Sequence, residues 1–327
     1  MRFPSQTSRR GSRSGGVPGG RFGIILIAII GLAVYWFSNQ KENAFTGRKQ
    51  FNTMSIADEV KLGAQAYSQI LQQEGGAVIC SPASRSCGMA EREVVEKVNE
   101  IGRRLEAAAI EWEDELIAQG VEFTPVARDF DWTYNVIASE QPNAFCLPGG
   151  YVAIYTRMMD ITGNNDGRFT LEDLDEESEL AMLAVVVGHE IGHALAHHGA
   201  ERMSQQKVAQ LGQAAIAIGV GDMDAGQRQA VLGAMGIATM GGLNAFSRTH
   251  ETEADVIGLE LLVRACYDPR LAPELWKRMD QLGGQKPPEW MSTHPASTTR
   301  AENFERLMPA AIAEYKRRCG PLPPLRQ

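Results

Sequence analysis

Apolar residues recur at helical spacing over several stretches of this chain. Residues 55–73 and 89–119 each carry one apolar stripe, with polar residues on the remaining faces. This pattern is typical of a helix that packs one face on a core. Ser55 and Asp58 have the spacing of an N-terminal cap for the first of these helices. The same periodicity predicts three later helices, at residues 250–264, 271–282 and 296–316.

Two short stretches rich in β-branched and aromatic residues predict strands. They cover residues 132–138 and Tyr151–Tyr155, and the Pro148-Gly149-Gly150 turn precedes the second. Residues 180–206 predict one helix, and its almost wholly apolar segment from Leu183 to Val187 is typical of a buried central helix. We therefore expect a mostly helical α+β fold with a small antiparallel sheet beside that helix.

Two further stretches have a less specific pattern. Residues 213–246 are rich in Ala, Gly and Met and predict a helical hairpin. A mobile lid, a membrane-surface patch and close helix packing through small residues all agree with that composition. Residues 162–175 form a polar insertion between the second strand and the central helix, where it could alter substrate access.

The N-terminus combines a basic arm with an apolar run. Residues 1–21 are rich in Gly, Ser and Arg and contain no acid, which is typical of disorder. The run Phe22–Phe37 would span about 24 Å as a helix, close to the ~30 Å hydrocarbon core of a bilayer. We favour a transmembrane anchor over a cleaved signal peptide, because apolar residues continue past the small-x-small match Gly31-Leu32-Ala33. The basic flank would stay cytoplasmic, and the rest would be exported.

This pattern divides the chain into five parts. They are a basic arm (1–21), a transmembrane anchor (22–38), a polar linker (39–54), one globular domain (55–319) and a C-terminal tail (320–327). The formal net charge of −8 argues against a nucleic-acid partner.

The five cysteines are compatible with an oxidising compartment. Cys80 and Cys87 bracket a loop-like stretch and could close a small disulfide. Cys266 and Cys319 could pair only if the fold brings their Cα atoms within about 7 Å. Cys146 is left over, and the alternative is that several of these residues are buried thiols.

All six histidines lie between His189 and His294, and His189-Glu190-Ile191-Gly192-His193 matches the metal-binding pattern H-E-x-x-H. Positions four apart share one face of a helix, so His189 and His193 can bind the same ion. Glu190 can then reach a water on that ion.

A catalytic zinc site needs a third protein ligand and an open position for water. Ala196 and Gly199 stand where one class of such enzymes has Gly and a third His, so that class is excluded. Glu251 is the candidate third ligand, with Glu253 as second choice. Asp255, on the same helical face as Glu251, can accept the outer N–H of a ligating histidine.

Together these motifs resemble the membrane-associated zinc endopeptidase family that includes HtpX and the CAAX prenyl proteases, in particular its exported bacterial branch. The stretches that carry the resemblance are Thr46–Gln50, Asn143–Gly150, His189–His198, Ser247–Asp255 and Thr293-His294-Pro295 with Arg300. They match the family in order and at similar separations.

The resemblance implies a zincin-like domain with one zinc ion per chain. Glu190 would act as general base on a water activated by the metal. His294 would donate to the carbonyl oxygen in the transition state, with Arg300 orienting it or adding charge. Backbone and amide groups of Asn143, Ala144 and Phe145 would hold an extended substrate along the sheet edge.

The expected function is therefore that of a zinc metalloendopeptidase anchored by a single span in a bacterial inner membrane and facing the periplasm. By resemblance, its substrates would be unfolded or misfolded envelope proteins. The alternative is a chaperone-like or assembly factor that binds unfolded chains without cleaving them. The intact Glu190 argues against that alternative, because binding needs no base. A prenyl-peptide protease is a weaker option, since the chain lacks a multi-helix membrane domain.

Overall fold

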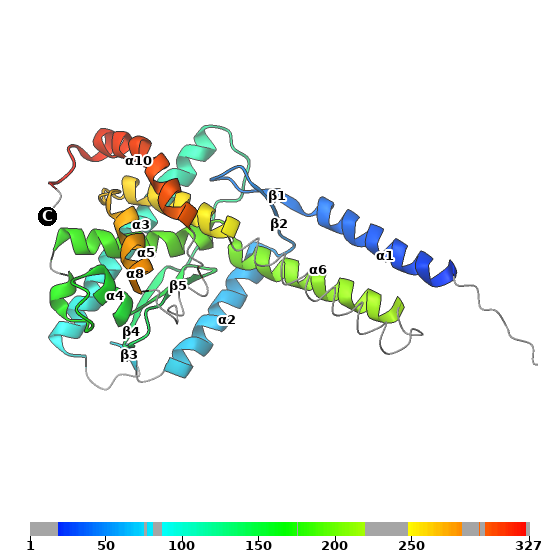
Figure 1. Ribbon diagram of the computed structural model, residues 1–327, viewed down its shortest axis with the longest axis horizontal. Helices are drawn as coiled ribbons and strands as arrows, with labels where there is room; N and C mark the ends of the chain where they lie inside the picture. The colour runs from blue at the N-terminus through cyan, green and yellow to red at the C-terminus, as the bar shows by residue number, and fades with distance from the viewer. Residues whose placement is uncertain are drawn as a thin grey trace, which may run out of the picture.

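The computed structural model shows a mostly helical α+β protein (Figure 1). The residues that it describes are 19–74, 77–80, 87–174, 176–219, 248–282, 294 and 298–324. Most of the predicted hairpin at 213–246, and residues 1–18 of the predicted arm, lie outside them.

The labelled helices of the described residues vary in length from two turns to about eight. They are α1 (Gly19–Ser38), α2 (Ile56–Glu74), α3 (Met89–Ala118), α4 (Thr156–Thr162), α5 (Glu177–Leu195), α6 (His198–Gly219), α8 (Leu271–Leu282) and α10 (Thr298–Cys319). Residues 248–264 are also helical, and a 3-10 turn, η2, covers Leu171–Leu174. The predictions for α2, α3, α8, α10 and the helix at 248–264 are confirmed to within a few residues. The start of α2 has the predicted cap, with the Asp58 N–H donating to Ser55 Oγ at 3.1 Å.

The sheet is mixed, which corrects the expectation of an antiparallel one. Its strands are β3 (Val78–Ile79), β4 (Thr133–Ile137), β5 (Ala144–Leu147) and β6 (Tyr151–Tyr155), in the order β3-β4-β6-β5. The two outer pairs are antiparallel, but β4 and β6 are parallel. After β4 the chain forms β5 at the edge of the sheet. It then turns back, and β6 fills the position between β4 and β5. Strand β6 therefore runs in the same direction as β4.

Side chains alternate between two helical layers along the strands. On β6, Val152 and Ile154 face the core shared with α3 and α5. Ala153 and Tyr155 face a smaller cluster with Tyr67 of α2. This alternation is the period-two pattern of a strand buried on both faces. The catalytic-motif helix α5 therefore packs directly on the sheet, beside β5 and β6.

The predicted helix over 180–206 is broken in the structure. Helix α5 ends at Leu195, and α6 begins at His198 after a bend of 48°. His197 adopts φ 56°, a left-handed conformation that ends a helix. Helix α6 then leaves the body of the protein and lies beside α1 (Figure 1).

Residues 39–54, interpreted as a polar linker, contain a β-hairpin instead. Strands β1 (Gln40–Glu42) and β2 (Lys49–Phe51) pair antiparallel. Phe51 is buried and stacks on Trp36 of α1 with ring centroids 4.3 Å apart. Because β1 and β2 are mostly polar, their apolar anchor is this aromatic contact, which the periodicity did not reveal.

Among the described residues, no single helix combines the length and the apolar character that crossing a membrane requires. The apolar part of α1, Leu26–Ser38, falls short in length, and α5 with the first part of α6 meets the criteria only as a bent pair.

Two disulfides form, and both use pairs that the sequence made candidates. Cys80–Cys87 has a Cα–Cα distance of 5.0 Å, and Cys266–Cys319 has one of 5.6 Å. Cys146 is a buried free thiol. The second disulfide joins the turn after the 248–264 helix to the end of α10.

Removing the longer disulfide is expected to destabilise the fold more than removing the shorter one. The bridges close loops with sequence separations of 53 and 7 residues. Chain entropy then predicts a loss of about 4 kcal/mol for Cys266→Ser/Cys319→Ser and about 2 kcal/mol for Cys80→Ser/Cys87→Ser. Equilibrium unfolding in urea measures both. Equal losses would contradict this account.

Candidate metal centre

The H-E-x-x-H residues lie on a deeply buried helix of the protein. His189, Glu190 and His193 of α5 are all buried, within the apolar core that α5 shares with α3 and the sheet. The one-turn spacing brings the Nε2 atoms of the two histidines to 3.1 Å from each other. The local helix therefore makes two of the candidate ligands neighbours.

The third candidate ligand reaches the site because two helices touch through glycines. A Cβ on Gly192 would lie 2.9 Å from the Ala254 carbonyl oxygen, and a Cβ on Gly258 would lie 2.9 Å from the His189 backbone nitrogen. Only glycine permits this approach of the 248–264 helix to α5. The approach carries Glu251, a residue far away in sequence, to the two imidazoles.

The ligand atoms of these residues converge. Glu251 Oε2 lies 3.2 Å from His189 Nε2, and Glu251 Oε1 lies 3.3 Å from His193 Nε2. His294 joins them, with its Nδ1 3.1 Å from Glu251 Oε1. The ligand atoms of the four residues all lie within 4.8 Å of one another. Two imidazole lone pairs and a carboxylate directed at one buried point fit a divalent cation.

A second set of buried groups holds the ligands from outside. Asp255 Oδ1 lies 3.0 Å from His189 Nδ1, the ring nitrogen that faces away from Glu251. Arg300 donates to Asp255 at 2.6 Å and to Glu251 at 2.9 Å. Its guanidinium also lies 3.4 Å from the centre of the Trp276 ring. Asp255 thus lies where it could accept the Nδ1–H of His189, and its role in fixing the tautomer of His189 stays a prediction.

Opposite electrostatic effects act on the two histidines. Burial would lower the pKa of His189, but its hydrogen bonds to Asp255 and Glu251 outweigh burial and raise that pKa to about 9. Burial dominates at His193 and lowers its pKa to about 4. Burial would raise the pKa of Glu251, yet the surrounding histidines hold it well below its usual value. The centre therefore presents an ionised carboxylate to a cation.

Comparison with known proteins now identifies the family. The sequence model of peptidase family M48 matches residues 110–308, which include His189, His193, Glu251 and His294. The chain belongs to peptidase family M48. Its relatives include metalloendopeptidases, and the chain is a metalloendopeptidase of that family. The family-level resemblance is confirmed, while the assignment to the HtpX and prenyl-protease group and to a bacterial branch stays a prediction.

Relatives occur in both mitochondria and bacteria. The mitochondrial metalloendopeptidase OMA1 of Schizosaccharomyces pombe is 29% identical over 295 residues, which cover 89% of this chain and 73% of that protein. Human mitochondrial metalloendopeptidase OMA1 is 32% identical over 62% of this chain and 36% of its own length. The β-barrel assembly-enhancing protease of Escherichia coli is 32% identical over 50% of this chain and 32% of its own length.

The remaining predicted site residues of this M48 peptidase lie in two places. Glu190 is buried, with Oε1 3.7 Å from His294 Nε2. Arg300 makes the contacts of a residue that positions Glu251 and Asp255. A catalytic role for Arg300 stays a prediction.

Ala144 and Phe145 begin the edge strand β5, and Asn143 directly precedes it. The Asn143 carbonyl accepts from the Tyr155 N–H at 3.0 Å, and its side-chain oxygen accepts from the Ala144 N–H at 3.0 Å. Strand β5 lies at the end of the sheet order, and within the described part of the chain it pairs only with β6. Burial and the nearby Glu190 carboxylate raise the pKa of the Cys146 thiol of β5. The edge strand thus runs beside Glu190.

Sequence reasoning missed a group of buried polar residues behind His193. No role was predicted for His198 or His250, and Glu253 was the second choice as a ligand. Both histidines are buried, and Glu253 points away from the ligand cluster toward His198 and Arg48. The sequence signal for this group is the Thr46–Gln50 stretch. Its arginine, Arg48, pairs with the buried carboxylates of Glu201 and Glu253 in the folded chain.

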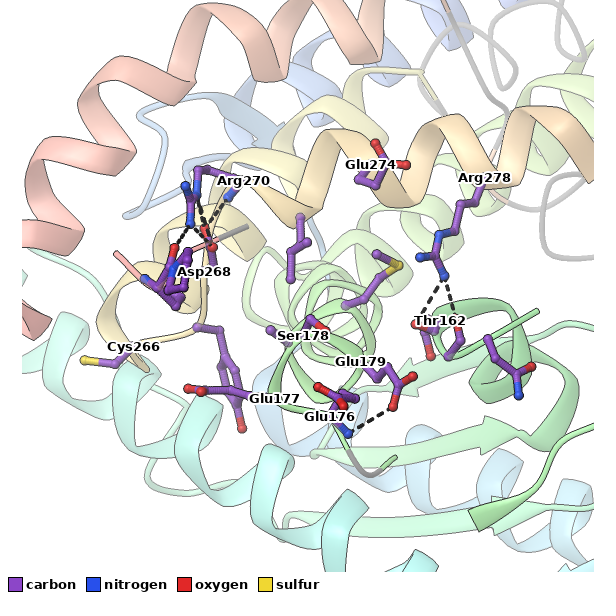
Figure 2. Close-up of a pocket in the computed structure, with 18 of the residues that line it drawn as sticks. Thr162, Glu176, Glu177, Ser178, Glu179, Cys266, Asp268, Arg270, Glu274 and Arg278 are labelled. Atoms are coloured by element: carbon purple, nitrogen blue, oxygen red, sulfur yellow. Dashed lines mark hydrogen bonds and ion pairs between the residues drawn. The ribbon is translucent and has the colours of Figure 1, made fainter. Parts of the chain in front are cut away.

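A large cavity lies at the other end of α5, away from these residues. It has a volume of about 1010 Å³. Its charged lining residues, drawn in Figure 2, are Glu176, Glu177, Glu179, Asp268, Arg270, Glu274 and Arg278. Arg270 is paired with Asp268 at 2.6 Å. At 1.5 Å per residue, Glu177 lies about 18 Å from His189 along the helix, so this cavity is separate from the metal centre.

The glycine contact predicts a specific sensitivity of the metal centre. Gly258→Ala should push the two helices apart, because its Cβ would meet backbone atoms of Gly188 and His189. We expect a loss of about 1–3 kcal/mol in unfolding free energy together with weaker metal binding. Thermal unfolding and metal competition with a chelator measure the two effects.

Gly199→Ala is the matched control. Its Cβ would lie 3.5 Å from Pro148 Cγ, an ordinary van der Waals contact. It should leave the free energy of unfolding unchanged or raise it by up to about 1 kcal/mol, because Ala has a higher helix propensity than Gly. Equal behaviour of the two variants would show that helix separation does not control the centre.

Proposed function

We propose that this protein is a zinc-dependent endopeptidase, with His189, His193 and Glu251 as the zinc ligands. The convergence of their three ligand atoms at 3.1–3.3 Å in a buried site supports this proposal. Two imidazoles and one carboxylate form a ligand set used by catalytic zinc sites. Softer sites rely on thiolates, and the free thiol among the described residues, Cys146, is outside the ligand group.

The chain's own residues divide the work of peptide hydrolysis. Zinc, when bound, polarises the peptide carbonyl and lowers the pKa of a water molecule. Glu190 accepts a proton from the attacking water and passes it to the leaving amine. His294, whose Nε2 lies 3.7 Å from Glu190, supplies a hydrogen bond to the carbonyl oxygen as it gains charge. Asp255 and Arg300 hold His189 and Glu251 in place.

The substrate in this proposal is an extended peptide. The edge of β5 that pairs with no other described strand offers backbone N–H and C=O groups, as strand addition requires. Ala144 and Phe145 begin that strand, Asn143 directly precedes it, and α5 packs against it. A sheet edge binds a peptide mainly through hydrogen bonds to the peptide's backbone, and less through its side chains. It therefore suits unfolded or misfolded segments of many sequences.

The proposed location is a bacterial inner membrane, with the catalytic domain in the periplasm. Large apolar residues are exposed on α1, as an apolar partner such as a bilayer would require. They are Leu26, Ile27, Ile29, Ile30, Val34 and Phe37. Two disulfides favour an exported domain. The bacterial β-barrel assembly-enhancing protease among the relatives supports a role in envelope protein quality control.

Two acid-to-neutral changes should separate binding from chemistry. Glu190→Gln should retain zinc but lower turnover by about 10²–10⁴-fold, the usual contribution of a general base. Glu251→Ala should lose the metal. Metal analysis and cleavage of unfolded casein measure the two effects.

The control is Glu96→Gln, the same change on a position of α3 outside the buried core. Full biological activity of Glu190→Gln would rule out proteolysis and favour the chaperone-like alternative.

The anchor makes a separate prediction. The full chain should sediment with membranes and need detergent for release, and a variant without residues 1–38 should be soluble. Fractionation followed by intact-mass measurement of the expressed protein tests this. A soluble mature chain that has lost roughly its first 30–40 residues, the length of a signal peptide with its flanks, would identify a cleaved signal instead.

A further inference from the structure

The outer face of His193 leads into a buried chain of polar side chains. His198 Nδ1 lies 2.9 Å from His193 Nδ1, and His198 Nε2 lies 3.0 Å from Glu253 Oε2. Both His198 and Glu253 are buried. The bend at His197 creates this contact, because a continuous helix would place residues five apart on different faces. The break between α5 and α6 therefore brings the His198 ring against the outer face of His193.

The ring protons of this chain can be assigned from its contacts. His193 Nε2 faces His189 and Glu251, so its lone pair is the one that a cation would take. Neutral imidazole carries one proton, and the His193 proton must therefore sit on Nδ1 and be donated to His198 Nδ1. His198 then carries its own proton on Nε2 and donates it to the Glu253 carboxylate.

Glu253 is itself fixed by the N-terminal hairpin. Thr46 Oγ1 donates to Glu253 Oε1, and Arg48 Nε donates to Glu253 Oε2 at 2.6 Å. Arg48 also pairs with the buried Glu201 at 2.6 Å. Two buried carboxylates without a cation between them would be strongly unfavourable. Thr46 and Arg48 lie outside residues 110–308, which match the family model.

We propose that His198, Glu253 and Arg48 form a positioning relay that fixes the tautomer and orientation of His193 as a metal ligand. The relay does for His193 what Asp255 does directly for His189. None of its members faces the point on which the ligand atoms converge, so they are positioning residues. The inference rests on the proposed function, because it requires His193 to bind the metal. It makes the N-terminal hairpin part of the support of the centre.

Metal affinity of the full-length apoprotein in detergent tests the relay, with Zn²⁺ titrated against a chelator. His198→Leu removes the acceptor for His193 and should weaken Zn²⁺ binding by about 10–100-fold, the usual effect of losing an outer partner of a ligating histidine. It should also lower kcat with little change in KM and alter the absorption spectrum of the Co²⁺-loaded protein. Wild-type affinity and an unchanged Co²⁺ spectrum in His198→Leu would overturn the relay.

His197→Asn is the matched control, one residue away. His197 lies outside the relay and contacts Glu59 at 3.0 Å, and Asn tolerates its left-handed backbone. This variant should bind Zn²⁺ as the wild type does. A loss equal to that of His198→Leu would mean that disturbing the bend, and not the relay, weakens the site.

The hairpin end of the relay gives a second test that does not depend on His198→Leu folding. Arg48→Met should weaken Zn²⁺ binding, and Arg48→Lys should recover part of the affinity by restoring a cation beside Glu253. Equal affinities of the Arg48→Met variant and the wild type would overturn the role of the hairpin. Glu251→Ala, measured in parallel, separates the two levels. If the wild type binds Zn²⁺ and Glu251→Ala does not, the proposed function stands whether or not the relay does.

Discussion

A carboxylate and two imidazoles share one buried point in the core of this protein, with their lone pairs directed at each other. Such a group is unfavourable in an apolar interior unless a cation or hydrogen bonds compensate for the lost water. The surrounding structure meets that requirement from every side. Arg300 pairs with Glu251 and Asp255, and Asp255 pairs with His189. The site is therefore built for a positive charge at its centre.

The same requirement explains the packing of α5 against the 248–264 helix. The carboxylate must approach the imidazoles to about 3 Å, the length of a charge-assisted hydrogen bond, and two helices with ordinary side chains at the contact have axes about 8–10 Å apart. Glycines at positions 188, 192 and 258 remove the side chains at this contact. The cost of glycine within helices is offset by the geometry that it allows. Both helices of this contact lie within residues 110–308, which match the model of family M48.

The N-terminal region is connected to the centre through a series of contacts. Trp36 of α1 stacks on Phe51 of the hairpin, and Arg48 of the same hairpin reaches Glu201 and Glu253. Helix α6, which begins at His198, returns along α1 (Figure 1). An anchor in the membrane would thus be joined to the catalytic domain through packed contacts, in place of the polar linker that the sequence suggested.

Local periodicity was enough to locate the helices α2, α3, α8 and α10 and the strands β4 and β6, and the H-E-x-x-H motif was enough to pair His189 with His193, because each depends on residues that are near in the sequence. Glu251 and Asp255 followed from their shared helical face. The parallel pairing of β4 with β6, the bend at His197 and the hairpin at 40–51 were not predictable in this way. They depend on contacts between segments far apart in the chain, such as Arg48 with Glu253, which no local pattern records. The residues thus specify which groups can bind a metal, and the packing of distant helices specifies how those groups are held.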